Sequence, residues 1–288
     1  MKKKIILTII MAAAIALTFA FALTACPASE QKDYAKVSFD TNGGVGTADT
    51  MKVSFDTNYG ELPTVLKDGY AFAGWFTDNA AGEQITPDTM LKNKSDHTLF
   101  ARWSKIKRNP ISTGGGNGFT VCIDTDGNLW TWGTNQYGLG DGKTGLSTTP
   151  IRIAEETKFC AVSVAPRNYS YAIDVNGNMW AWGENGYGAF GDGTKINRPI
   201  PALTAEGTKF VDVSAGGLTL LEDGSVGITS LAIDASGNLW EINNGLWEVS
   251  DYFFGYEKFT AISANGNCRH AIDTDGNIWG WGGNGSPD

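Results

Sequence analysis

Short runs in which apolar and polar residues alternate, separated by turn dipeptides, fill most of the chain. Residues 37–42 and 53–58 both read VSFDTN, and each runs into Asn-Gly or Asn-Tyr-Gly. Alternation with a period of two is typical of half-buried strands, because successive side chains of a strand point to opposite faces. Further strand-like or connecting segments follow at residues 68–78, 84–91 and 97–103.

From about residue 111, one stretch of sequence, such as AIDVNGNMWAWG at 172–183, returns four times. A second marker, the Lys-Phe pair, begins at Lys158, Lys209 and Lys258, in steps of 51 and 49 residues. The period is therefore close to 50 residues, a size that predicts a propeller or a solenoid.

Within one unit the pattern predicts strands at residues 159–164, 171–173 and 179–183, with a turn at 174–178. The Asn-Gly and Asp-Gly dipeptides favour primed turns, because Asn and Gly tolerate positive φ. The Trp residues supply volume to pack one sheet on the next. Because a single sheet cannot bury both of its faces, neighbouring units must cover them.

Residues 34–104 carry a motif of their own. It reads G-Y-x-F-x-G-W-F from Gly69, I-T from Ile85 and T-L-F-A-x-W from Thr98. This stretch resembles the Listeria–Bacteroides repeat, also called the internalin B-repeat. The resemblance implies a small β-grasp-like module of bacterial surface proteins that serves as a spacer or an adhesion module.

Residues 111–288 resemble a second family through a turn, a Trp-rich strand and a Gly-rich segment in each unit. In the first unit these are Ile123-Asp124-Thr125-Asp126-Gly127, Leu129-Trp130, Trp132-Gly133, Asn135, Tyr137-Gly138 and Leu139-Gly140-Asp141-Gly142. This pattern is similar to the repeat of the regulator of chromosome condensation family. The resemblance implies a β-propeller, commonly with seven four-stranded blades.

The repeat block departs from that pattern in three ways. Only about four units are present, the third has an insertion near residues 220–228, and residues 243–257 replace its Gly-rich segment. The fourth unit stops within the motif at residues 285–288. We therefore expect an all-β protein, with a β-grasp-like module followed by a partial propeller of about four units. A truncated gene product, an open propeller and a ring closed between chains remain alternatives.

The N-terminus predicts export. Three lysines precede an almost wholly apolar run, 5–23, and Leu23-Thr24-Ala25-Cys26 resembles the lipobox of bacterial lipoproteins. The resemblance implies removal of residues 1–25, a diacylglycerol on the Cys26 thiol, and a polar tether over residues 26–33. A transmembrane anchor is one alternative, since about 20 apolar residues span a bilayer. A signal peptide with a chance cysteine is the other.

Composition and charge narrow the range of partners. The net charge is −9, and an acidic chain repels phosphate backbones, so we expect no nucleic-acid partner. Without Cys26, three cysteines remain, an odd number that excludes full internal pairing. Cys122 and Cys160 occupy slots that hold Ala, Val or Thr in other units, so we expect them to be small core fillers.

The repeated turn looks at first like the start of a calcium loop, with Asp124 and Asp126 as ligands. An EF-hand needs a Glu at position 12 and a following helix. Here Asn135 takes that position and a Trp-rich strand follows. The histidines, His97 and His270, lie in no catalytic motif. We therefore expect hairpin turns, no metal, no cofactor, no catalytic residue and no enzyme activity.

The sequence thus indicates a surface lipoprotein, anchored through Cys26 on the extracytoplasmic face of the membrane. It would act as a non-catalytic protein-binding or adhesion module on an extracellular protein or a cell-wall polymer. A purely structural wall or spacer protein is the alternative, and an extracellular hydrolase is a third candidate. Trp and Tyr dominate binding hot spots. The candidate binding surface, with core filling as its alternative, is Trp247, Tyr252, Phe253, Phe254 and Tyr256.

Overall fold

The computed structural model of the chain describes residues 32–67, 69–106, 111–113, 118–135, 139–220, 224, 226–243, 245–250, 257–266 and 268–282. Strands and turns make up the regular structure of these residues, as predicted. None of them belongs to a helix that could cross a membrane. The predicted signal peptide and the lipid site at Cys26 lie outside this part of the chain.

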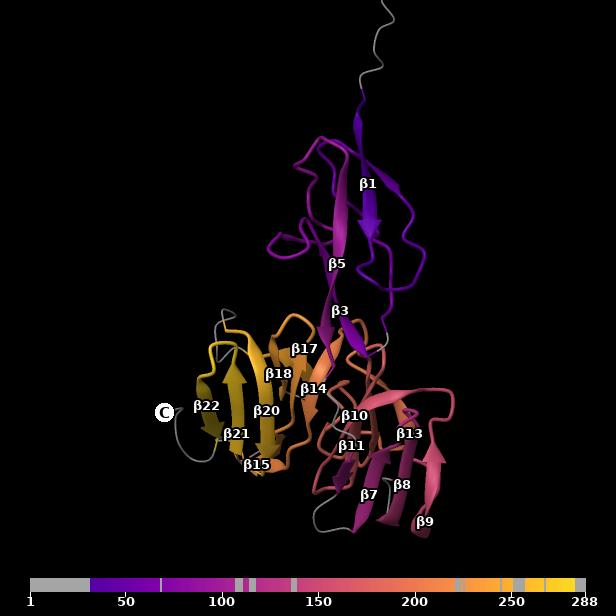
Figure 1. The fold of residues 1–288 in the computed structure, drawn as a ribbon. Helices are drawn as coiled ribbons and strands as arrows, with labels where there is room; N and C mark the ends of the chain where they lie inside the picture. Colours follow the sequence, from indigo (N-terminus) through magenta and orange to yellow (C-terminus); the bar gives the residue numbers. More distant parts are fainter. Residues whose placement is uncertain are drawn as a thin grey trace, which may run out of the picture.

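A five-stranded mixed sheet of β-grasp-like order forms the N-terminal module (Figure 1). Its strands are β1 (Tyr34–Asp40), β2 (Met51–Ser54), β3 (Tyr70–Phe76), β4 (Gln84–Ile85) and β5 (His97–Lys105). The order is β2-β1-β5-β3-β4, and β1 and β5 run parallel. The motif residue Trp75 is 1% exposed and donates its indole N–H to the carbonyl of Pro63 at 2.9 Å. The family motif therefore encodes the core of this module.

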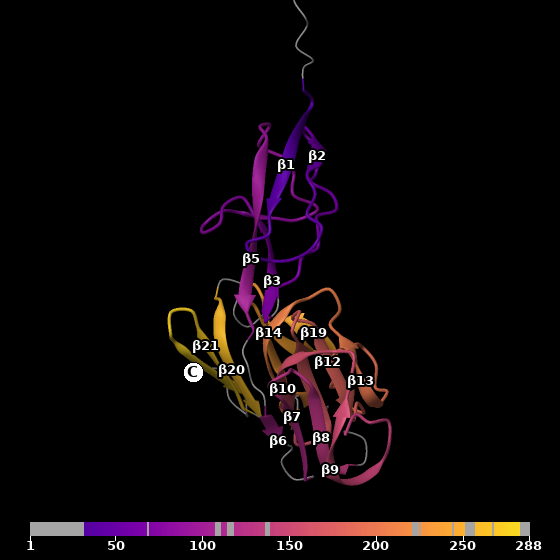
Figure 2. The ribbon, with the colours of Figure 1, turned by 45° about the vertical axis from the view of Figure 1, so that its right-hand side comes forward.

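Four smaller sheets follow, and each one corresponds to a repeat unit (Figures 1 and 2). Blade 1 consists of β6 (Ile111–Thr113), β7 (Phe119–Ile123), β8 (Leu129–Asn135) and β9 (Gly145–Ile153). Blade 2 consists of β10 (Phe159–Val164), β11 (Tyr169–Asp174), β12 (Met179–Gly183) and β13 (Arg198–Thr204).

Blade 3 consists of β14 (Phe210–Ser214), β17 (Leu231–Asp234), β18 (Leu239–Asn243) and β19 (Leu246–Val249). The predicted insertion forms a separate hairpin between its first two strands, β15 (Leu218–Leu220) and β16 (Val226–Ile228). Blade 4 consists of β20 (Phe259–Asn265), β21 (Cys268–Asp273) and β22 (Ile278–Gly282). First strands of neighbouring blades contact each other, which is the arrangement of a partial propeller.

Each blade packs one face on the next blade. We call the side facing the following blade the front face and the other side the back face. In blade 2 the front face carries Tyr171, Ile173 and Met179, which share one core cluster with blade 3. Its back face carries Ala172 and Trp182, which share another cluster with blade 1. All six residues of β11 are consequently buried, as expected for a sheet covered on both sides.

The N-terminal module is docked on the blades. Gly69 donates its backbone N–H to Val175 O at 3.3 Å, and the Ser104 hydroxyl donates to Ala235 O at 2.6 Å. Ala71 is fully buried, and together with Ile106 it joins the core cluster between blades 2 and 3. Figures 1 and 2 show the β3–β5 end of the module reaching down to β14. The module therefore covers the turn end of blades 2 and 3.

Candidate functional site

The repeated turn is a hairpin whose first aspartate is saturated by internal donors. In blade 2, Asp174 Oδ1 accepts the N–H groups of Asn176 (2.8 Å) and Asn178 (3.0 Å). Its Oδ2 accepts the Asn178 amide at 2.8 Å and the Trp180 indole N–H at 3.0 Å. Asp124, Asp234 and Asp273 make the same four bonds in their own turns.

These bonds occupy the aspartate oxygens that a calcium ion would otherwise bind. Side-chain hydrogen bonds from Asn128 and Trp130 hold the pKa of Asp124 far below its usual range, despite partial burial. The carboxylate is thus an acceptor already used by the hairpin. Across the described residues, no group of three or more His, Cys, Asp or Glu side chains could hold a metal ion.

The predicted turn type is wrong. Gly127, Gly177, Gly237 and Gly276 have φ between 79° and 88°, whereas the residues before them do not have positive φ. Gly127 N bonds Asp124 O, and Asp124 N bonds Asn128 O, both at 3.0 Å. This is a three-residue loop with glycine in the left-handed position. The aspartate side chain holds the first loop residues in place, so only one residue needs positive φ.

The same turn also links consecutive blades. Lys158 donates its ammonium to Asn128 Oδ1 at 2.6 Å, and Phe159 donates its N–H to Gly127 O at 2.9 Å. Lys209 and Lys258 reach Asn178 and Asn238 in the same way. The Lys-Phe marker and the Gly-Asn end of the turn are therefore two halves of one junction between blades.

The histidines have structural surroundings. His97 Nε2 lies 2.8 Å from the Tyr59 hydroxyl and His97 Nδ1 lies 2.8 Å from Ser95 O, within the module. His270 is exposed on the front face of blade 4, where blade 2 has Tyr171. The structure brings neither histidine together with a cluster of titratable groups in the described residues.

The structure corrects the predicted binding surface at Trp247, whose side chain is only 7% exposed. Its ring centroid lies 5.7 Å from that of Tyr171 and 6.4 Å from that of Phe210, and its backbone N–H donates to Gly191 O at 3.0 Å. Trp247 fills the core between blades 2 and 3. The other four members, Tyr252, Phe253, Phe254 and Tyr256, lie outside the described residues, so their exposure stays a prediction.

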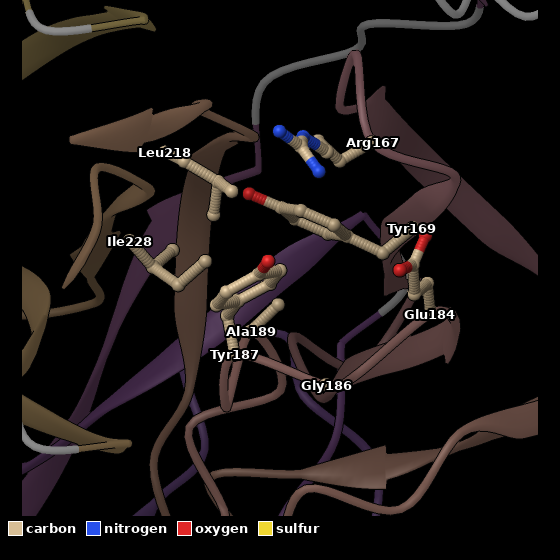
Figure 3. A pocket seen from close by; sticks show the side chains of 8 residues that line it. All are labelled: Arg167, Tyr169, Glu184, Gly186, Tyr187, Ala189, Leu218 and Ile228. Atoms are coloured by element: carbon tan, nitrogen blue, oxygen red, sulfur yellow. The ribbon is translucent and has the colours of Figure 1, made fainter. Parts of the chain in front are cut away.

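A shallow, open hollow with a cavity volume of about 10 Å³ lies at the end of blades 2 and 3 that is opposite the docked module. It is formed by the β10–β11 loop, the segment after β12 and the β15–β16 hairpin. Figure 3 shows Leu218 and Ile228 on one side of it and Glu184 on the other. The lining residues are Arg167, Tyr169, Glu184, Gly186, Tyr187, Ala189, Leu218 and Ile228.

Aromatic rings and two opposite charges give the hollow its chemistry. The Arg167 guanidinium lies 5.9 Å from the centroid of the Tyr187 ring, within cation–π range. Tyr187 is 42% exposed, whereas Tyr169 is buried and donates its hydroxyl to Gly216 O at 2.7 Å. Burial raises the pKa of Tyr169, so its phenol stays neutral. Glu184 is the one carboxylate of the lining.

Buried hydrogen bonds hold the segment after β12 in shape. Asn185 is fully buried, and its amide donates to Thr194 O at 3.0 Å, while its carbonyl accepts from Phe190 N–H at 2.9 Å. This explains why the repeat pattern has Asn after Trp-Gly. The sequence reasoning missed Arg167 as a site residue. One signal was available, because the fourth unit has glycine at this point, Gly266.

Two family models match parts of the chain, in the predicted order. Residues 36–102 match the Listeria-Bacteroides repeat domain, and residues 176–219 match the regulator of chromosome condensation repeat. No curated protein sequence matches the chain.

Several solved structures resemble the chain at low identity. Human WBSCR16 is 11% identical with a TM-score of 0.50, over 88% of this chain and 77% of its own. Prp20p of Saccharomyces cerevisiae, described with its binding to Gsp1p and histones, is 23% identical with a TM-score of 0.46, over 60% of this chain and 44% of its own. The CRINKLY WD40 ectodomain of the Arabidopsis thaliana receptor kinase ACR4 is 17% identical with a TM-score of 0.39, over 60% and 55%.

Proposed function

We propose that the chain is a lipid-anchored binding protein of the bacterial surface, which holds a partner protein at the hollow of blades 2 and 3. The observation that carries this proposal is a difference between the two ends of the blades: one end is covered and the other is open to a partner. The module covers the turn end through Ala71 and Ser104, and the aromatic hollow lies at the opposite end. A partner at that end meets loops on a rigid scaffold, where binding residues are most often found.

The lining of the hollow suits contact with one side chain of a partner protein. The hollow is shallow, with a cavity volume of about 10 Å³, whereas pockets for small molecules measure roughly 300–1,000 Å³. Arg and Tyr are enriched at binding hot spots. Arg167 and Glu184 carry opposite charges at its rim, and the buried Tyr169 ring lies beside them. A polar-ended side chain with an apolar stem fits this lining.

We propose binding without turnover. Glycoside hydrolysis commonly uses two carboxylates that flank the scissile bond, and Glu184 is the one carboxylate of the hollow. An extracellular hydrolase therefore gains no support from this site.

Binding is tested by chemical crosslinking of a surface extract to the purified protein, followed by mass spectrometry of the captured protein. We expect one partner that is retained by the parent chain and lost on Tyr187→Ala and Arg167→Ala. Ile200→Ala, which changes an exposed apolar residue on β13, is the matched control and keeps the partner. Equal capture by all variants, or none by the parent chain, contradicts the proposal and favours a purely structural role.

Anchoring is tested separately by feeding cells an alkyne-labelled fatty acid. The proposal expects the label on the parent chain and its loss on Cys26→Ser, with the variant no longer processed before residue 26. A chain that stays in the membrane fraction without label would indicate a transmembrane anchor instead.

A further inference from the structure

The front face of blade 4 exposes apolar residues, although the same face is buried in the three blades before it. Its residues Ile272 and Ile278 are 38% and 77% exposed. The equivalent residues are no more than 9% exposed in blade 1 (Ile123, Leu129), blade 2 (Ile173, Met179) and blade 3 (Ile233, Leu239).

Strand register establishes this equivalence. Ile272 pairs with Ile278 between β21 and β22, as Ile173 pairs with Met179 between β11 and β12. By the same register, His270 takes the place of Tyr171, and Cys268 takes the place of Tyr169. Both of these blade 4 residues are exposed, whereas both tyrosines of blade 2 are buried. Blade 4 thus presents the whole face that a following blade covers elsewhere.

The back face of blade 1 is the complementary surface. Thr120 pairs with Trp132, and Cys122 with Trp130, as Ser170 pairs with Trp182 and Ala172 with Trp180. In blade 2, Trp182 and Ala172 are fully buried against blade 1. Thr120, Cys122 and Trp132 are partly exposed, whereas their blade 2 counterparts are buried; Trp130 is partly exposed, as Trp180 is.

We propose that the front face of blade 4 binds the back face of blade 1 of a second copy of this chain. Three core clusters within the chain already use this contact, in which apolar and aromatic front residues meet Trp and small back residues. The facing side chains named for both surfaces carry no carboxylate, lysine or arginine, and Arg152, which pairs with Trp130, adds a positive charge at the β9 edge of the back face. The net charge of −9 therefore does not oppose the contact at its centre.

The contact is head-to-tail, because the two surfaces differ. This gives it a specific signature in mixing experiments. A chain with a damaged front face still has an intact back face, and a chain with a damaged back face still has an intact front face. Neither variant pairs with itself, but the two pair with each other.

The test is sedimentation velocity of the chain from residue 27, which keeps every described strand and omits the predicted lipid site. We expect concentration-dependent association for the parent chain. Ile278→Glu (front face) and Trp132→Arg (back face) each sediment as monomers, and an equimolar mixture of the two forms a heterodimer. Thr120→Arg is a second, milder back-face variant, and near-ultraviolet circular dichroism checks that each variant is folded. Ile196→Glu is the matched control, because Ile196 is 72% exposed outside both faces.

The native cysteines supply a second readout. Cys268 lies on the front face of blade 4 and Cys122 on the back face of blade 1, so association slows their alkylation in the parent chain and in Ile196→Glu, but not in Ile278→Glu. A parent chain that stays monomeric up to near-millimolar concentration overturns the proposal. So does association that persists in both face variants, or a mixture of them that stays monomeric.

Discussion

The aspartate that opens each repeated turn is the residue on which the blades most depend. One carboxylate organises its own loop and fixes the indole of the next strand, as Asp124 does for Trp130 at 2.8 Å. The adjoining Asn128 then receives the lysine of the following blade. One turn therefore sets the hairpin, the orientation of a tryptophan and the junction to the neighbouring sheet.

Replacing Asp124 by alanine should lower the free energy of unfolding clearly more than replacing Asp126 does, because several donors lose their acceptor at once. Urea unfolding followed by circular dichroism measures this. Asp126→Ala is the matched control, since Asp126 is an exposed carboxylate in the same loop. Its substitution should change the free energy by less than about 0.5 kcal/mol. Equal effects of both substitutions would show that the four bonds of Asp124 add nothing to stability.

The same aspartates predict how stability depends on pH. Hydrogen bonds lower the pKa of Asp124, and in Asp273 burial acts to raise the pKa but hydrogen bonds outweigh it. A folded-state pKa below the unfolded value stabilises the fold above the unfolded pKa, which is about 3.9 for aspartate. This contribution is lost as pH falls below about 4 toward the lower folded pKa. Urea unfolding from pH 7 to pH 3 should therefore show the difference between the parent chain and Asp124→Ala shrinking in the acidic range. A difference independent of pH contradicts this assignment.

The sequence predicted the hairpins but not their mechanism. Asp-x-x-Gly-Asn between two apolar runs is a strong turn signal, and the structure has a hairpin at each of these four places. The dipeptide alone did not show whether one or two residues take positive φ. That depends on the Asp124 side chain, whose bonds to Asp126 N and Asn128 N appear only once the loop is closed.

Blade 3 shows how a degenerate unit keeps the architecture of the others. It lacks the Gly-rich segment, yet β19 completes a four-stranded sheet, and Trp247 extends from it into the core that it shares with blade 2. Gly191 of blade 2 makes room for this ring, since a Cβ there would lie 2.2 Å from Trp247 Cδ1. Loss of the motif in one unit is thus accommodated by a glycine kept in its neighbour.

Trp247→Ala should cost about 3–5 kcal/mol, because it leaves a cavity between two blades. Its neighbour Leu246 is 45% exposed on the same strand, and Leu246→Ala is the matched control with an expected cost below about 1 kcal/mol. Chemical unfolding of both variants measures the difference. A small cost at Trp247 would mean that its ring does not fill this core in solution.

The repeated strands were readable from sequence, whereas alternation of apolar and polar residues did not predict β13 or β19. β10, β11 and β12 carry the apolar runs and the turn between them. β13 reads RPIPALT, with two prolines and a single buried position, so it gives no strand signal by alternation. Only the family resemblance implied a fourth strand. A strand at the outer edge of a blade pairs with one neighbour only. Its sequence therefore carries a weak strand signal.

Docking of the module on the blades was also beyond the sequence. Besides Ile106, the contact is made by Ala71, by the backbone of Gly69 and by one hydroxyl, Ser104, and these three do not stand out by hydrophobicity or charge. The motif around Ala71 predicted a spacer or an adhesion module, separate from the repeats of residues 111–288. In the structure, the end of the spacer sheet is part of the core between blades 2 and 3.

Ala71→Arg should separate the module from the blades, because the space around the Ala71 methyl group is filled. A Cβ added to Gly177 would lie only 3.0 Å from the Ala71 Cβ, so an arginine side chain does not fit there. Hydrogen exchange followed by mass spectrometry should then show faster exchange at the covered turns, residues 174–178 and 234–238. The equivalent turn of blade 4, residues 273–277, carries no module contact in the described residues and serves as the internal reference.

Ala81→Arg is the matched variant for this experiment, since Ala81 is exposed in a loop of the module and makes no contact with the blades in the described cores. It should leave exchange at all three turns unchanged. If Ala71→Arg also leaves residues 174–178 unchanged, the two parts of the chain are independent in solution. The turn end of the blades would then be as accessible to a partner as the hollow, and accessibility would no longer favour binding at the hollow.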